Sequence, residues 1–136
     1  MARIDRVRHY RPDLEKAVGF SQAVRSGGWL MLAGLCSCDE QALCIGKDDM
    51  ALQLRTIYQE IETILRDHGI GFADVVRETI YTTDLNALVA AGAERARFYL
   101  EAEAAFPAAT WLQVSGLFGP DFLLEVEITA ELSATS

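Results

Sequence analysis

One segment, residues 50–68, limits the fold of this chain more than any other. Its apolar residues recur at spacings of three and four, which is the period of one helix face: Met50, Leu54, Ile57, Tyr58, Ile61, Ile64 and Leu65. Asp48 and Asp49 supply carboxylates that can cap a helix N-terminus, and Gly69 provides a stop. The pattern predicts one long amphipathic helix whose apolar stripe needs another element to cover it.

Strand patterns lie on both sides of that helix. Two short runs joined by the turn Ser26-Gly27-Gly28 predict a β-hairpin, and later segments rich in β-branched residues predict further strands. The predicted strands are residues 21–25, 29–35, 75–83, 109–115 and 122–132. Asp84 can cap a second helix over residues 85–100, which ends before Phe106-Pro107.

The predicted order is ββαβαββ, an α+β chain with a mixed sheet and both helices packed on one face. The length of 136 residues suits one domain, residues 1–136. Within it, residues 1–17 are expected to form an N-terminal arm or strand, and residues 133–136 a flexible tail. Tyr81, Trp111 and Leu123 are candidates for an exposed apolar patch on the other sheet face, which predicts an oligomer.

Charge and composition exclude several classes of function. The formal net charge is −8, whereas a protein that binds nucleic acid through the phosphate backbone needs a basic face. No apolar run approaches the length of about 20 residues that a membrane span needs. The cysteines, Cys36, Cys38 and Cys44, are odd in number and close in sequence, which favours reduced thiols and a cytoplasmic location.

The order and spacing of several short motifs resemble the RidA/YjgF family from about Val18 to Leu132. The matching pieces are Ser21-Gln22-Ala23-Val24, Ala33-Gly34, Leu65-Arg66-Asp67-His68-Gly69, Asp74-Val75-Val76, Tyr81-Thr82-Thr83-Asp84-Leu85, Phe106-Pro107-Ala108 and Leu124-Glu125-Val126-Glu127-Ile128. The resemblance implies a chorismate-mutase-like fold and a homotrimer with three clefts between subunits. It also implies hydrolysis of reactive enamines and imines to ketones and ammonia, without a metal or organic cofactor.

The chain departs from the family at three positions of that cleft. Ala109 stands where deaminating members carry an Arg that holds the substrate carboxylate, a task suited to a bidentate guanidinium. Phe20 replaces a tyrosine, and Gly92 replaces an asparagine. We therefore expect a divergent member that does not act on simple 2-imino acids.

The last predicted strand retains the acidic group of the family. Glu125 corresponds to the glutamate that positions the attacking water, and it is the candidate catalytic residue. Glu127, two residues on, shares its strand face, although a solvated face is the simpler interpretation for Glu127 and Glu131.

The resemblance places Phe20, Gly34, Ala109, Thr110 and Trp111 among the substrate-binding positions, together with Glu127. Trp111 would make the cleft more aromatic and suited to a larger, less acidic ligand, unless it only packs between subunits. Arg95 is a candidate substitute for the missing Arg, and the alternative is a solvated helix residue.

The three cysteines allow several interpretations. A zinc site needs four ligands, which only His9 or His68 could complete, and a nucleophilic cysteine needs a nearby base. Small buried apolar residues are the simplest alternative. The sequence predicts no metal site.

Two functions follow from these observations. One is a divergent hydrolase of a reactive imine or enamine, and the other is a trimer that binds a small molecule or docks to a partner without catalysis. Some relatives carry ribonuclease names, but the acidic charge disfavours RNA cleavage.

Overall fold

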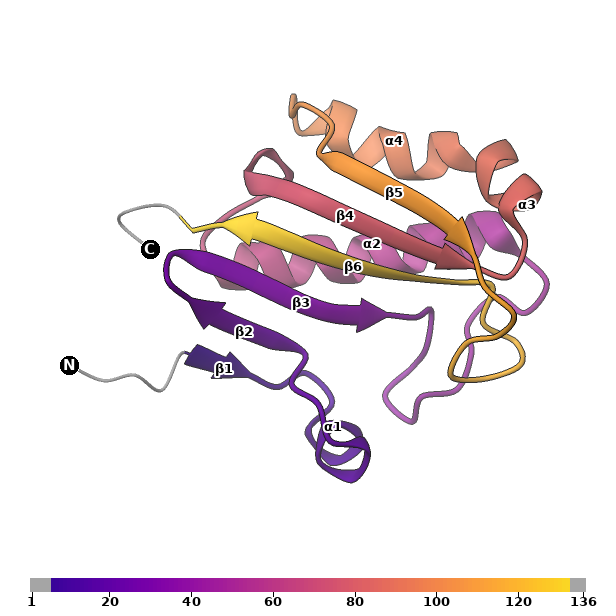
Figure 1. Ribbon diagram of the computed structural model, residues 1–136, viewed down its shortest axis with the longest axis horizontal. Helices are drawn as coiled ribbons and strands as arrows, with labels where there is room; N and C mark the ends of the chain where they lie inside the picture. The colour runs from indigo at the N-terminus through magenta and orange to yellow at the C-terminus, as the bar shows by residue number, and fades with distance from the viewer. Residues whose placement is uncertain (1–5, 133–136) are drawn as a thin grey trace.

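A computed structural model describes residues 6–132, and its centre is one six-stranded sheet. The strand order is β1-β2-β3-β6-β4-β5 (Figure 1). The strands are β1 (Val7–Arg8), β2 (Ala23–Ser26), β3 (Trp29–Leu35), β4 (Val75–Thr82), β5 (Ala108–Gln113) and β6 (Leu124–Glu131). Neighbouring strands are antiparallel except β4 and β5, which are parallel. The sheet is therefore mixed, as the sequence predicts.

The two longest helices, α2 (Met50–Asp67) and α4 (Gly92–Glu101), cover one face of the sheet, as Figure 1 shows. The side chain of Asp49 caps α2 by accepting from the Leu52 N–H at 3.0 Å. The apolar stripe of α2 packs into the core, where alternate residues of β6 are also buried: Leu124, Val126, Ile128 and Ala130. A 3-10 turn, η2 (Phe72–Asp74), leads from α2 into β4.

The second predicted helix, residues 85–100, is divided in two. Asp84 caps α3 (Leu85–Ala90) by accepting from the Ala87 N–H, as expected, but α3 ends at Ala91 and α4 begins at Gly92. Glycine is a poor helix former, which favours a break at this junction.

The expectation of an arm or strand over residues 1–17 was incomplete, because the structure contains a further helix, α1 (Pro12–Val18). Its anchor is the buried carboxylate of Glu15, which accepts from the backbone N–H groups of Tyr10, Arg11 and Gln22 at 2.7–2.8 Å. Pro12 at the first turn is the sequence signal for this helix. The predicted tail, residues 133–136, lies outside the described residues.

The second sheet face carries the polar residues of β6. Glu125, Glu127 and Thr129 alternate with the buried residues and so point away from the helices. Tyr81 of β4 pairs with Glu125 and shares this face. In residues 6–132, no helix is long and apolar enough to cross a membrane.

The expected apolar patch of Tyr81, Trp111 and Leu123 is wrong in two of its members. Trp111 pairs with Ile80, which is buried under the helices, so Trp111 lies on the helix side. Leu123 is partly buried against the core. The exposed apolar residues on this face include Trp29 and Met31, which pair with Glu131 and Thr129, and Leu112, which pairs with Tyr81.

Candidate functional site

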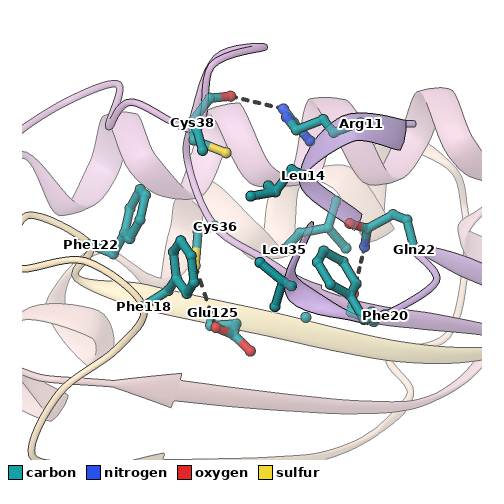
Figure 2. Close-up of a pocket in the computed structure, with 14 residues that line it drawn as sticks. Arg11, Leu14, Phe20, Gln22, Leu35, Cys36, Cys38, Phe118, Phe122 and Glu125 are labelled. Carbon is teal, nitrogen blue, oxygen red and sulfur yellow. Dashed lines mark hydrogen bonds between the residues drawn. The ribbon is translucent and has the colours of Figure 1, made fainter. Parts of the chain in front are cut away.

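A cavity of about 330 Å³ lies between α1, β3, β6 and the loops that follow β3 and β5 (Figure 2). Its walls are mostly apolar and include Leu14, Phe20 and Phe118. Glu125 of β6 provides a carboxylate at one wall, beside Gly34 of β3. Three of the predicted site residues, Phe20, Gly34 and Glu125, therefore line one cavity whose volume suits a small ligand.

Two neighbours fix the carboxylate of Glu125. The Cys36 thiol donates to Oε1 across 3.4 Å. A Cβ atom built on Gly34 would overlap Oε2, so a larger residue at position 34 would displace the Glu125 side chain. The carboxylate is thereby held with one oxygen bonded and the other packed against backbone.

Cys36 acts as a donor rather than a nucleophile. Burial raises the pKa of its thiol, and the adjacent Glu125 carboxylate raises this pKa further. A protonated thiol is a weak nucleophile and remains able to donate. None of the interpretations that the sequence allows for Cys36, as a packing residue, a metal ligand or a nucleophile, includes this contact, which joins positions 89 residues apart.

The rim of the cavity is built by Arg11, which precedes α1. Its guanidinium donates to Glu60 of α2, at 2.7 Å for the shortest pair, and to the backbone carbonyls of Cys38 and Asp39. Figure 2 shows the bond to Cys38. These bonds tie the loop after β3 to α1 and α2.

The other predicted site residues lie at the far edge of the sheet. Ala109 and Trp111 are on β5, and their register partners on β4, Glu78 and Ile80, are both buried on the helix side. Glu125 points to the opposite face. One chain therefore cannot present Ala109 and Glu125 to the same small ligand.

A buried ion pair lies beside Ala109. Arg95 of α4 donates from Nε to Glu78 Oε1 at 2.7 Å, and its Nη2 lies 2.6 Å from the same oxygen. Tyr58 and Tyr99 donate their hydroxyl protons to the other oxygen of Glu78. Burial raises the pKa of Tyr99, and the charge of Glu78 adds to this shift.

Aromatic rings surround the Arg95 guanidinium. Its central carbon lies 5.1 Å from the ring centre of Tyr99, 5.6 Å from that of Phe106 and 5.3 Å from that of Trp111. Burial acts to lower the pKa of Arg95, but the bond to Glu78 outweighs it and the pKa is raised. The interpretation of Arg95 as a solvated residue was wrong, because only 8% of it is exposed.

Thr110 and Glu127 lie on the open sheet face. They belong neither to the lining of the Glu125 cavity nor to the ion pair of Arg95 with Glu78. Arg77 donates to the Thr110 hydroxyl at 2.6 Å, and the Tyr81 hydroxyl donates to Glu127 at 2.7 Å. This bond to Glu127 raises the pKa of Tyr81. Both predicted residues are thus engaged within the sheet.

Within residues 6–132, no three His, Cys, Asp or Glu side chains are grouped so that they could hold a metal ion.

The fold and the cavity define a small α+β protein of the YjgF type. The crystal structure of a member of the YjgF/YER057c/UK114 family from Mycobacterium tuberculosis matches it with a TM-score of 0.76 and 31% identity, over 92% of this chain and 97% of that one. Residues 11–132 match the model of the family described as Endoribonuclease L-PSP. The chain belongs to this family, which confirms the resemblance to RidA/YjgF proteins.

Relatives of known sequence agree with that assignment. A RutC family protein from Pyrococcus horikoshii is 32% identical over 85% of this chain and 89% of its own length. A 2-iminobutanoate/2-iminopropanoate deaminase from Salmonella typhimurium is 27% identical over 84% of this chain and 88% of its own length. Some members of the family are therefore imine deaminases.

Proposed function

We propose that this protein hydrolyses a reactive imine or enamine, with Glu125 as the catalytic base. The observation that carries the proposal is the Glu125 carboxylate, held by Cys36 and Gly34 at the wall of an otherwise largely apolar cavity. The deaminase names of several relatives support it.

The chemistry asks little of the protein. Glu125 accepts a proton from water as the oxygen attacks the C=N carbon. The Glu125 carboxyl returns this proton to the nitrogen, and the carbinolamine then transfers its hydroxyl proton to the nitrogen and expels ammonia, so an imine and water become a ketone or aldehyde and ammonia. Because the C=N carbon is already electrophilic, these steps call for no cofactor.

We propose that the working site is a cleft between subunits of a homotrimer. Ala109 and Trp111 face away from Glu125 within one chain, so a neighbouring chain must supply one of the two groups if both contact the ligand. A closed ring of three identical subunits would provide three such clefts. The three free cysteines favour the cytoplasm as the place of action.

The charged groups near β5 favour a substrate that does not need a cation of the protein to bind a carboxylate. The chain has Ala109 where family deaminases use Arg, and the nearby Arg95 is already neutralised by Glu78 and covered by Trp111. The Glu125 carboxylate adds a negative charge to the side of the proposed cleft that lies opposite β5. We propose a larger and less acidic substrate than 2-iminopropanoate, one that places an apolar or aromatic group against Trp111.

Although the family model is named for a ribonuclease, the net charge of −8 opposes the approach of a polyanion. We therefore propose imine hydrolysis rather than RNA cleavage.

The test uses three imines that separate the effect of the carboxylate from that of the aromatic ring. An amino-acid oxidase generates imines from alanine and phenylalanine, and an amine oxidase generates the imine of phenethylamine, which differs from that of phenylalanine by the carboxylate. We expect the protein to accelerate ammonia release most from the phenethylamine imine, less from the phenylalanine imine and least from 2-iminopropanoate. Glu125→Gln should abolish the acceleration, whereas Glu131→Gln, an exposed glutamate of the same strand, should retain it.

Saturable binding of these compounds without turnover would contradict the proposed hydrolase and indicate a binding protein instead. Preferential hydrolysis of 2-iminopropanoate would contradict the proposed substrate class while leaving the reaction intact.

A further inference from the structure

Two cysteines that the proposed reaction does not use, Cys38 and Cys44, face each other across a small hairpin. They form an isolated antiparallel bridge. The flanking bonds run from Asp39 N–H to Leu43 O and from Ile45 N–H to Ser37 O, both at 2.9 Å.

The positions of these two hydrogen bonds show which type of antiparallel pair Cys38 and Cys44 form. The bonds join the residues on either side of the cysteines rather than the cysteines themselves, so the two form a non-hydrogen-bonded pair. In such pairs the Cα atoms are about 4.5 Å apart and the side chains lie close together on one side. Disulfides span Cα separations of about 4.4–6.8 Å, so the backbone already meets this requirement.

We propose that Cys38 and Cys44 form a reversible dithiol–disulfide site, oxidised by hydroperoxides, on the wall of the Glu125 cavity. Cys38 lines this cavity, and so does Ala42 of the same hairpin. The inference does not rest on the proposed hydrolase activity.

Forming the disulfide would break only weak contacts of the Cys44 thiol. Cys44 makes two weak contacts, donating to the Asp121 carbonyl and accepting from Gln53, each at 3.5 Å. The Gln53 amide also donates to Gly46 O at 2.9 Å and to Asp121 O at 3.0 Å, so these groups keep partners when the thiol turns away.

The hairpin is also ordered in advance. Asp39 Oδ1 accepts from the N–H groups of Gln41 and Leu43, and the Arg11 guanidinium donates to the carbonyls of Cys38 and Asp39. The two cysteines are therefore held in register before any oxidation.

The third cysteine, Cys36, is not expected to react. Its thiol is already engaged as the donor to the Glu125 carboxylate, at 3.4 Å. Cys36 also lies outside the bridge that pairs Cys38 with Cys44, and the chain bends at Ser37 between Cys36 and Cys38. The site is therefore selective for one pair among three thiols.

The oxidation proceeds in two steps. The thiolate of one cysteine attacks the terminal oxygen of a hydroperoxide, and the O–O bond breaks. The terminal oxygen stays on the sulfur as a sulfenic acid, and the remainder of the hydroperoxide leaves as an alcohol or, from hydrogen peroxide, as water. The second thiolate attacks that sulfur, the S–S bond forms, and the departing hydroxide takes up a proton as water. Two thiols lose two hydrogen atoms, and a thiol reductant restores them.

The experiment treats the full chain with hydrogen peroxide, blocks the remaining thiols with an alkylating reagent and maps the peptides by mass spectrometry. We expect one intramolecular link between Cys38 and Cys44, the loss of two hydrogen atoms, alkylation at Cys36, and reversal by a thiol reductant. Cys36→Ser should form the same link, and Cys38→Ser and Cys44→Ser should not.

A link that contains Cys36 would overturn the proposal, as would links formed only between chains or none at all in the wild-type protein. The wild-type measurement decides the matter even where a serine variant fails to fold.

Discussion

The position of the Glu125 carboxylate depends on the smallest residue in its surroundings. Gly34 leaves room for Oε2, and Cys36 supplies a donor to Oε1. A general base works only when its acceptor atom lies within reach of the attacking water, so small displacements are costly.

Replacing Gly34 by Ala should therefore lower kcat for imine hydrolysis at least about tenfold, because the added methyl group displaces Glu125. Gly116→Ala is the matched control, since a Cβ there meets nothing within 4 Å. Steady-state kinetics and thermal melting of both variants provide the measurement. Unchanged kcat in Gly34→Ala would show that the placement of Glu125 does not limit the reaction.

Sequence reasoning reached some of these residues and not others. The alternation along β6 correctly predicts the face of Glu125, because that strand is buried on one side. The prediction that Trp111 lies on the open face was wrong, because most residues of the edge strand β5 are exposed and leave no clear alternation. The contact of Cys36 with Glu125 has no local pattern that could predict it.

At the scale of elements, the helix α4 is joined to β4 by a charge pair in an apolar layer. Glu78 is fully buried, and its carboxylate bonds to the side chains of Arg95, Tyr58 and Tyr99. Removing one partner of such a pair leaves a buried charge uncompensated, which costs more than the pair contributes.

Arg95→Met should lower the free energy of unfolding by about 3 kcal/mol, because Glu78 loses its counter-charge. Adding Glu78→Gln should recover part of the loss. Arg66→Met, which removes an exposed pair with Glu62, should cost no more than about 0.5 kcal/mol. Urea unfolding measures all three, and equal losses for Arg95→Met and Arg66→Met would refute the argument.

The short helix α1 depends on one carboxylate. Burial acts to raise the pKa of Glu15, but the N–H groups of Arg11 and Gln22 and the bond to His9 outweigh it, so the pKa is lowered. A carboxyl group with a lowered pKa stabilises the fold above its unfolded pKa, about 4.3, and this stability is lost as the pH falls through the folded pKa.

Glu15→Gln should lower the free energy of unfolding by about 2 kcal/mol at neutral pH, because three backbone donors lose a charged acceptor. The wild type should lose this advantage as the pH falls below the unfolded pKa of about 4.3, so the two curves should converge in acid. Urea unfolding at neutral pH and below that pKa tests it, and parallel curves would contradict the role of Glu15.

The elements also differ in how well sequence predicts them. The stripe of α2 spans five turns and identifies that helix directly. Helix α1 has only seven residues, and its stability comes from Glu15 bonding to Gln22, the residue before β2, a contact that periodicity does not reveal. The break at Gly92 is likewise a matter of local helix propensity within a continuous alanine-rich segment.

At the scale of the whole molecule, the two halves of the proposed site lie on opposite sheet faces of one chain. Glu125 points to the open face, and Trp111 packs on the helix side against Arg95. A ring of subunits would join the Glu125 half of one chain to the Trp111 half of the next.

This arrangement predicts complementation between two defective variants. Glu125→Gln and Trp111→Ala should each lose hydrolysis of an aromatic imine, but oligomers reassembled from an equal mixture should place both intact halves in about one cleft in four. Activity of the mixture after dissociation and reassembly measures this, with each variant alone as control. A mixture no more active than its components would place the complete site within one chain.

The pairing of Arg95 with Glu78 also bears on how such a chain changes its chemistry over time. Residue 109 is the register partner of Glu78, so an arginine introduced there begins beside a guanidinium that already holds the carboxylate. Removing Arg95 first would strand Glu78 in the core. An arginine at position 109 and the loss of Arg95 are therefore coupled changes, because either one alone leaves the charges around Glu78 unbalanced.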